Sequence, residues 1–144
     1  MDDLFSYDPK TVGTKGLIYV GEQIVVYRRT SDAPSHPGEL DLPGGAPEGQ
    51  ETPFETLRRE VYEEFGLEIE KKDVVYARRY PSLLQPDKFG WFATAKLPTE
   101  AEEKIVFGDE GDEYMLMTPG AYLARDDAAT FLQDRTKDYL ASLA

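Results

Sequence analysis

Short apolar runs bounded by turn residues recur along the chain, and such runs predict strands. Two β-rich runs, Lys15–Val20 and Gln23–Arg29, are joined by a Gly-Glu pair that favours a hairpin. Further strands are expected later in the chain, at Leu40–Leu42, Val74–Tyr80, Phe89–Lys96, around Lys104–Phe107 and at Tyr114–Met117. The pattern therefore predicts a protein with a substantial sheet.

One segment shows helical spacing in place of alternation. Thr52 occupies an N-cap position before a proline, Glu55 completes a capping box, and Gly66 is a good C-terminal stop. Between these signals the apolar residues follow a helical stripe, namely Phe54, Leu57, Val61 and Phe65. We predict a helix over Pro53–Phe65.

The remaining segments complete the expected architecture. We expect an irregular segment at residues 1–13, a loop at Thr30–Glu39 and mostly loop at Thr99–Glu113. An amphipathic helix is expected from Asp126 onward. Strands and helices mix without regular βαβ alternation, which favours an α+β or α/β/α arrangement over a doubly wound sheet. A length of 144 residues fits one domain, residues 1–144.

Composition excludes several classes of function. The chain has no cysteine and a single histidine, His36, so a disulfide framework, a Cys-based zinc site and a Ser-His-Asp triad are not expected. Its 28 acidic and 16 basic residues give a net charge of −12, which disfavours binding to nucleic acid. No apolar run is long enough for a membrane span, and the first residues are acidic, so we expect a cytoplasmic protein that does not bind membranes.

Three glutamates of the predicted helix share one face. At about 100° per residue, Glu60, Glu63 and Glu64 fall within roughly 100° of arc beside the apolar stripe. Like charges at this spacing repel, although Arg59 can pair with Glu63 and with Glu55. The face is either a solvated charged surface or a set of ligands for a hard divalent cation, and helical spacing alone does not separate the two.

The residues upstream of the helix separate these interpretations. The segment Gly45–Leu67 reads GAPEGQETPFETLRREVYEEFGL, which has the form G-x5-E-x7-R-E-U-x-E-E-x-G-U, where U is aliphatic. This pattern resembles the signature of the Nudix hydrolase family at every specified position. The flanking LPGG, Arg28-Arg29 and the later GDEG resemble the MutT-type branch. The resemblance implies an α/β/α sandwich with a central mixed sheet.

The same resemblance implies a metal-dependent reaction. Nudix enzymes hydrolyse a nucleoside diphosphate linked to another moiety, with water attacking phosphorus beside a divalent cation, Mg²⁺ or Mn²⁺. By motif position, Glu60, Glu63 and Glu64 are the expected metal-binding and catalytic residues, and the carbonyl of Gly44 is a further expected ligand. A pair between an earlier glutamate and the motif arginine, Glu51 and Arg59, is expected to hold the loop on the helix.

The general base has more than one candidate, because members of the family differ in the acid that serves. Glu60 is one, and a glutamate on a later loop is the other. Glu110, in the GDEG segment, fits the second role best and is also expected to be a metal ligand. Three other acids compete with it, Glu102, Glu103 and Glu113.

The substrate is less well defined than the reaction. Candidate substrate contacts are Arg28, Arg29, Asp41 and Arg79. We expect a pyrophosphohydrolase of a nucleoside triphosphate, including an oxidised deoxynucleotide, as the leading function. The alternatives are an ADP-ribose or nucleotide-sugar pyrophosphatase and a nucleotide sensor that does not cleave. The expected partner is a small nucleotide, and the resemblance also allows a homodimer.

Overall fold

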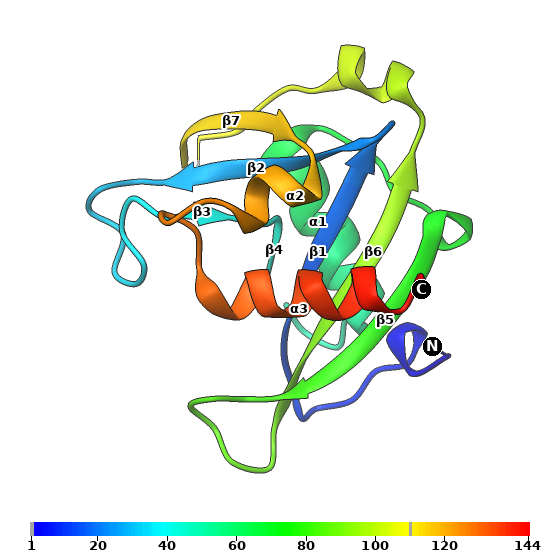
Figure 1. The fold of residues 1–144 in the computed structure, drawn as a ribbon. Coiled ribbons are helices and arrows are strands. Elements are labelled where there is room, and N and C mark those ends of the chain that lie inside the picture. The colour runs from blue at the N-terminus through cyan, green and yellow to red at the C-terminus, as the bar shows by residue number, and fades with distance from the viewer. Residues whose placement is uncertain (1, 110) are drawn as a thin grey trace.

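The computed structural model describes residues 2–109 and 111–144, and this part of the chain forms one mixed seven-stranded sheet. Its main path runs β3-β2-β1-β6-β5, with β4 paired to β1 and β7 to β2 (Figure 1). The strands are β1 (Thr11–Val20), β2 (Gln23–Arg29), β3 (Leu40–Asp41), β4 (Gly44–Gly45), β5 (Val74–Pro81), β6 (Phe89–Leu97) and β7 (Gly111–Met117).

The centre of the sheet is the parallel pair of β1 and β6, and the other strand pairs are antiparallel. Because β1 also pairs with the two-residue strand β4, the glycine turn at the start of the Nudix-like motif is held at the middle of the sheet. This pairing sets Thr14 opposite Gly45 and Lys15 opposite Gly44.

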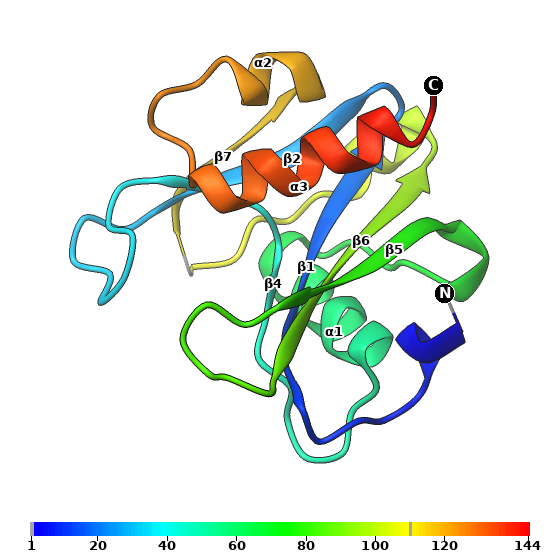
Figure 2. The ribbon, with the colours of Figure 1, turned by 60° about the horizontal axis from the view of Figure 1, so that its bottom comes forward.

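Helices cover both faces of the sheet, and Figure 2 shows α1 and α3 on opposite sides of β1. They are α1 (Pro53–Phe65), α2 (Pro119–Leu123) and α3 (Thr130–Ala141). One apolar cluster lies between the sheet and α1, with Leu57, Val61 and Phe65 at its centre. A second lies on the α2 and α3 side, around Tyr122, Leu132 and Tyr139. The fold is thus the expected α/β/α sandwich with a central mixed sheet.

The predicted helix Pro53–Phe65 is confirmed with the same bounds. The Thr52 hydroxyl accepts the backbone N–H of Glu55 at 3.1 Å, and the Glu55 carboxylate accepts that of Thr52 at 2.8 Å. These two bonds form the capping box and satisfy N–H groups that lack partners within the helix. Gly66 ends the helix with φ of 68°, in the left-handed region that favours glycine.

Several sequence-based boundaries were wrong. The first strand begins at Thr11, because residues 11–14 pair with β6. The strand expected around Lys104–Phe107 is not formed: a 3-10 helix covers Thr99–Lys104, and the N–H groups of Val106 and Gly108 bond the last carbonyls of α1. The C-terminal helix begins at Thr130 in place of Asp126.

The short helix α2 was not predicted at all. Its N-cap, Thr118, accepts the N–H of Ala121 at 3.2 Å, and a proline follows it, as one follows Thr52. The same start signal therefore occurs at both helices. Among the residues described, no helix combines the length and apolar character that crossing a membrane requires.

Candidate active site

The glycine turn before α1 brings backbone and carboxylates together. The Gly44 N–H donates to Glu64 Oε1 at 3.1 Å. Gly44 has φ of 138°, and a Cβ there would lie 2.0 Å from the Thr14 carbonyl oxygen, so only glycine fits. A Cβ on Gly45 would lie 2.8 Å from the Glu60 carboxyl carbon. The Glu60 side chain therefore occupies the space that this glycine leaves open.

The three motif glutamates differ sharply in exposure. Glu64 is 1% exposed, whereas the side chains of Glu60 and Glu63 are 14% and 44% exposed. The burial of Glu64 argues against the interpretation of this face as a simple solvated charged surface. The reason for this burial is the pairing of β4 with β1, which lays the glycine turn across this part of the helix. A helical projection does not contain that tertiary contact.

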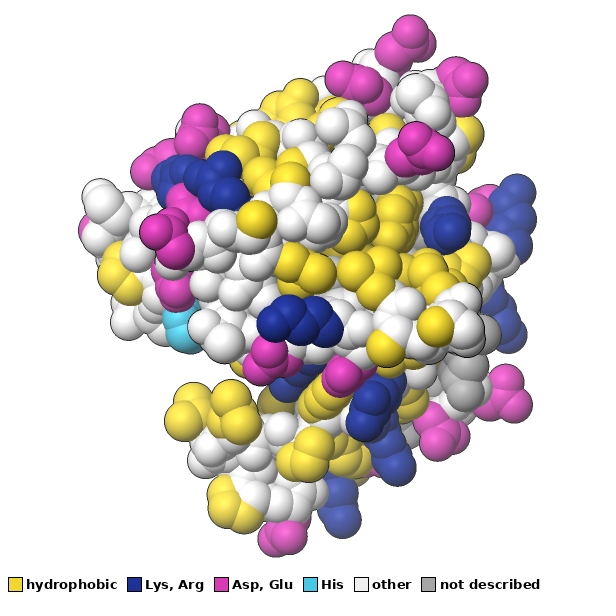
Figure 3. Space-filling model, viewed as in Figure 1, with side chains coloured by type: hydrophobic (Ala, Val, Ile, Leu, Met, Phe, Trp, Pro, Cys, Tyr) yellow, Lys and Arg dark blue, Asp and Glu magenta, His cyan; other side chains and the backbone are white. Residues whose placement is uncertain are grey.

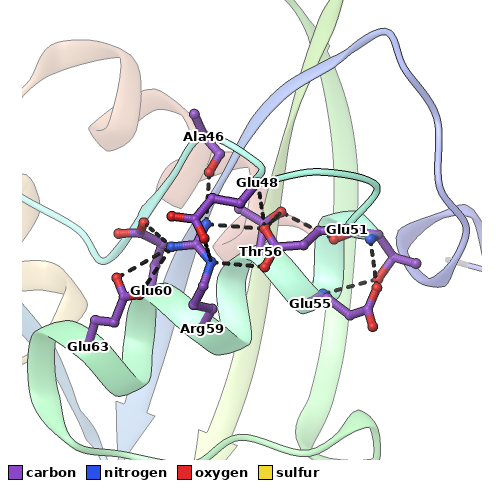
Figure 4. Close-up of polar contacts among 9 residues, drawn as sticks. Ala46, Glu48, Glu51, Glu55, Thr56, Arg59, Glu60 and Glu63 are labelled. Atoms are coloured by element: carbon purple, nitrogen blue, oxygen red, sulfur yellow. Dashed lines mark hydrogen bonds and ion pairs between the residues drawn. The ribbon is translucent and has the colours of Figure 1, made fainter.

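Arg59 connects the loop and the helix at the centre of this region (Figure 4). Its guanidinium lies 2.9 Å from Glu51, 2.8 Å from Glu60 and 3.3 Å from Glu63. It also donates to the Ala46 carbonyl at 3.0 Å and lies 3.5 Å from the Glu48 carboxylate. The expected pairs with Glu51 and Glu63 are present. The expected pair with Glu55 is absent, because that carboxylate closes the capping box.

These contacts shift the ionisation of the partners. The hydrogen bonds from Arg59 hold the pKa of Glu51 below its usual range. The same bonds to Glu51 raise the pKa of the Arg59 guanidinium, so it stays charged. The cluster is therefore an ion-pair network in which one cation faces several anions.

The donor chemistry of this region suits a hard divalent cation. Three carboxylates and the Gly44 carbonyl are oxygen ligands of the kind that Mg²⁺ and Mn²⁺ bind. Within the described residues, however, no three acidic or histidine side chains are grouped to enclose an ion. Glu60 and Glu63 point to Arg59, and Glu64 holds the Gly44 N–H. The ligands fit the metal by type.

Asp41, a candidate substrate contact, lies in a buried polar cluster. Its Oδ2 accepts hydrogen bonds from the Lys15 ammonium at 3.1 Å, the Tyr27 hydroxyl at 3.1 Å and the Arg29 guanidinium at 3.0 Å. Lys15 also donates to the carbonyls of Leu42, at 3.0 Å, and Gly44, at 3.4 Å. Burial, and then the Asp41 charge, raises the pKa of Tyr27. Asp41 therefore orients two cations beside the glycine turn.

The other candidate contacts lie apart from this cluster. Arg28 pairs with Glu113 at 3.1 Å and with Asp127 at 3.2 Å. Arg79 is exposed, with its guanidinium carbon 4.6 Å from the centroid of the Phe89 ring. Glu102 and Glu103 are exposed on the 3-10 helix at Thr99–Lys104. The preferred loop acid, Glu110, lies outside the described residues.

A cavity of about 430 Å³ opens next to the glycine turn, on the α3 side of the sheet. Figure 3 shows this face hollowed between α3 and the hairpin that joins β5 to β6, with hydrophobic side chains gathered on the hairpin. Gly45 and Lys15 line the cavity at the motif. The opposing walls come from the hairpin and α3, through Leu83, Leu84, Phe131 and Arg135. A smaller cavity of about 200 Å³, lined by Arg29 and Asp41, also contacts Lys15 and Phe131.

Sequence reasoning missed Lys15, Phe131 and Arg135. Lys15 had a signal, since it interrupts an otherwise apolar strand. Phe131 and Arg135 are four residues apart, so they share a face of α3, but this spacing also suits an ordinary amphipathic helix. Only the packing of α3 across the sheet places them at the cavity.

Comparison with known proteins agrees with this geometry. The NUDIX domain family model matches residues 9–138, and the chain therefore belongs to the Nudix family and is a Nudix hydrolase. A search of curated proteins gives no match.

Solved structures share the fold at low sequence identity. A MutT protein from Methanosarcina mazei Go1 has a TM-score of 0.72 and 21% identity, over 92% of this chain and 94% of that one. An Ap4A hydrolase from C. elegans, in a binary complex, has a TM-score of 0.67 and 16% identity, over 91% of this chain and 97% of that one. A third structure is a bifunctional NMN adenylyltransferase/ADP ribose pyrophosphatase from Francisella tularensis, complexed with AMP and a manganese ion. Its TM-score is 0.62 and its sequence identity is 16%. That match covers 84% of this chain and 36% of the other.

Proposed function

We propose that this Nudix hydrolase cleaves a phosphoanhydride bond of a nucleoside diphosphate derivative, with a nucleoside triphosphate, including an oxidised deoxynucleotide, as the leading substrate. The observation that carries the proposal is the complete motif Gly45–Leu67, folded with Glu60 and Glu64 against its glycine turn. ADP-ribose and dinucleoside polyphosphates, named for two of the similar structures, are alternative substrates.

The residues of the motif divide the work. Glu60, Glu63, Glu64 and the Gly44 carbonyl would hold Mg²⁺ or Mn²⁺, and the manganese ion in the Francisella complex supports this type of ion. The bound metal would supply positive charge beside the phosphate oxygens. Glu60 or Glu110 accepts a proton from the attacking water. The water oxygen bonds to phosphorus, and the anhydride P–O bond breaks. The departing phosphate keeps the electron pair of that bond.

The cavity beside the turn supports a small-molecule substrate. Lys15, held by Asp41, places a positive charge next to the motif, where the diphosphate would lie. Arg29 shares the same carboxylate and is a second candidate for phosphate contact, while Arg28 and Arg79 stay weaker candidates. The absence of cysteine and the net charge of −12 support a cytoplasmic enzyme that does not bind nucleic acid. A homodimer is the assembly we propose to test for.

The test is metal-dependent turnover across a nucleotide panel. We expect Mg²⁺-dependent release of phosphate or pyrophosphate from at least one nucleoside triphosphate, abolished by chelator and reduced by Glu63→Gln about 100-fold or more. Glu63 is the most exposed of the three motif glutamates, so this change should leave the melting temperature unaltered.

The matched control is Glu68→Gln, an exposed glutamate just beyond the motif, which should keep wild-type turnover. The panel includes ADP-ribose and dinucleoside polyphosphates. If the folded protein binds nucleotides but hydrolyses none of the panel, the proposed hydrolysis is wrong and the protein is a nucleotide sensor.

A further inference from the structure

Arg135 has an unusual environment for an arginine in an acidic protein. Its guanidinium carbon lies 4.5 Å from the centroid of the Tyr80 ring and 5.0 Å from that of Phe131. Burial lowers the pKa of this guanidinium. Among the described residues, no carboxylate lies within 4 Å of it and no protein acceptor takes its N–H groups. Five donors of a partly desolvated cation are therefore left for water or a ligand.

The other basic side chains at the cavity are already paired. Lys15 bonds the Asp41 carboxylate, and the His36 ring bonds the Glu39 carboxylate. No aspartate or glutamate is among the described residues that line this cavity. Arg135 is therefore the cation of the described cavity wall whose N–H donors are not used by the protein.

The position of Arg135 separates it from the proposed phosphate site. Lys15 is on β1, whereas Tyr80, on which Arg135 stacks, is on β5, with β6 between the two strands. Two strand spacings put these positions roughly 10 Å apart across the sheet. The wall around Arg135 is apolar, formed by the hairpin leucines and Phe131. Such a wall suits a flat heterocycle better than a second phosphate.

We propose that Arg135 is a specificity-determining residue that donates to an oxo group on the base of the substrate. The proposal rests on the proposed function, which places the diphosphate at the motif; the base of such a substrate would then lie in the adjoining cavity. Arginine donates two parallel hydrogen bonds to the O6 and N7 edge of a 6-oxopurine. Adenine presents an amino group at position 6, so an N–H donor of the guanidinium would face an N–H donor of the base. The cavity therefore selects bases with an oxo group at position 6 of a purine or position 4 of a pyrimidine over those with an amino group at that position.

Nucleoside monophosphates test this inference without catalysis, because they contain no phosphoanhydride bond. Inosine and adenosine monophosphates differ at position 6 by an oxo or an amino group, and uridine and cytidine monophosphates differ likewise at position 4. By calorimetry with the wild-type protein, we expect the oxo member of each pair to bind about 10-fold more tightly. Arg135→Met should reduce this ratio to about one.

Two further variants separate base recognition from charge. Arg135→Lys keeps the positive charge and loses the planar fork, so the ratio should also fall under this change. Arg78→Met is the matched control, because Arg78 also stacks on Tyr80 but is exposed and does not line the cavity. It should keep the wild-type ratio.

Equal binding of both members of each pair by the wild-type protein would overturn the inference. So would an Arg135→Met protein that loses affinity equally for all four nucleotides, because that result would assign Arg135 to phosphate. Turnover of the matching triphosphates, measured in parallel, keeps the two proposals apart. Hydrolysis without discrimination refutes only the role of Arg135, whereas discrimination in binding without hydrolysis refutes only the proposed reaction.

Discussion

Two arginines on opposite faces of the sheet illustrate two uses of the same side chain. Arg59, on α1, contacts four carboxylates and a backbone carbonyl. Arg135, on α3, contacts two aromatic rings and, within the described part of the chain, no carboxylate. The N–H donors of Arg59 are bound by groups of the protein, whereas those of Arg135 are available to water or a ligand.

The difference does not come from a shortage of acids near Arg135. Asp138 follows it by three residues, a spacing that often gives a pair on a helix. In the structure Asp138 accepts the Tyr80 hydroxyl at 2.8 Å and lies 3.4 Å from Arg78. A nearby acid in the sequence is therefore committed to other partners, which leaves the Arg135 guanidinium at the cavity uncompensated.

The contrast associates Arg59 with the stability of the fold and Arg135 with ligand binding. An ion-pair network that joins a loop to a helix fixes the geometry of the motif, and breaking it leaves partly buried carboxylates without a counter-charge. A partly desolvated cation on two aromatic rings contributes less to the folded state than such a network, and its unused donors are available to a ligand. Stability measurements on the two positions should therefore diverge.

The largest divergence is expected for removal of each guanidinium. Arg59→Met leaves Glu51 and Glu60, whose side chains are 19% and 14% exposed, without their cation and should lower the unfolding free energy by about 2 kcal/mol. For a chain of this size that corresponds to a fall in melting temperature of roughly 6 °C. Arg135→Met, which loses only two ring contacts and keeps an apolar side chain there, should stay within about 1 kcal/mol of wild type. Thermal melts of both variants measure the difference.

Equal losses of stability in the two variants would contradict the comparison. Arg58→Met is a useful third protein, because it removes an exposed arginine from the same helix without breaking an ion pair that the structure describes. A loss as large in Arg58→Met as in Arg59→Met would assign the effect to helix α1 in general.

The sequence predicted the α1 side of the molecule well, because its signals are local. Thr52, Glu55 and Gly66 act within a few residues of the helix ends, so the bounds of α1 followed directly. The pair between Arg59 and Glu51 followed from the resemblance to the Nudix motif. Most strands were also placed correctly, since alternation is a property of neighbouring residues.

The cavity could not be predicted in the same way, because it depends on contacts between distant segments. Arg135 meets Tyr80 across 55 positions of sequence, and Lys15 meets Asp41 across 26. The burial of Glu64 has the same origin, since it depends on the pairing of β4 with β1. Propensity and periodicity carry no information about such contacts.

A smaller effect should appear in the acid range, through Glu51. Arg59 lowers the folded-state pKa of Glu51, so this carboxylate stabilises the fold above its unfolded pKa of about 4.3. That stabilisation is lost as the pH falls through the lower folded-state value. Glu51→Gln should therefore be less stable than wild type by about 1 kcal/mol at pH 7, and the gap should narrow below pH about 4.3. Urea unfolding from pH 7 to pH 3.5 measures the gap.

A gap that stays constant over this range would show that Glu51 acts through packing or hydrogen bonding alone. Glu22→Gln, an exposed position in the hairpin between β1 and β2, controls for the general effect of removing one carboxylate from a protein of net charge −12. Its difference from wild type should not show the narrowing expected of Glu51→Gln.

The smallest expected effect concerns Glu64 and separates its structural contact from its proposed role at the metal. Glutamine keeps an oxygen that can accept the Gly44 N–H, and it removes a buried charge four residues from Glu60. In chelator, Glu64→Gln should therefore melt like wild type or be a few tenths of a kcal/mol more stable. Glu64→Ala removes the acceptor and should cost about 1–2 kcal/mol under the same conditions.

Excess Mg²⁺ should reverse the order of wild type and Glu64→Gln. A ligand that binds the native state adds RT ln(1 + [L]/Kd), and loss of a ligand carboxylate raises Kd, so the variant should gain less from the metal. Melts of the wild-type protein and both variants, in chelator and in Mg²⁺, give the two terms separately. If Glu64→Gln melts clearly lower than wild type in chelator yet gains equally from Mg²⁺, Glu64 only anchors the glycine turn. The metal would then be held by Glu60, Glu63 and other ligands.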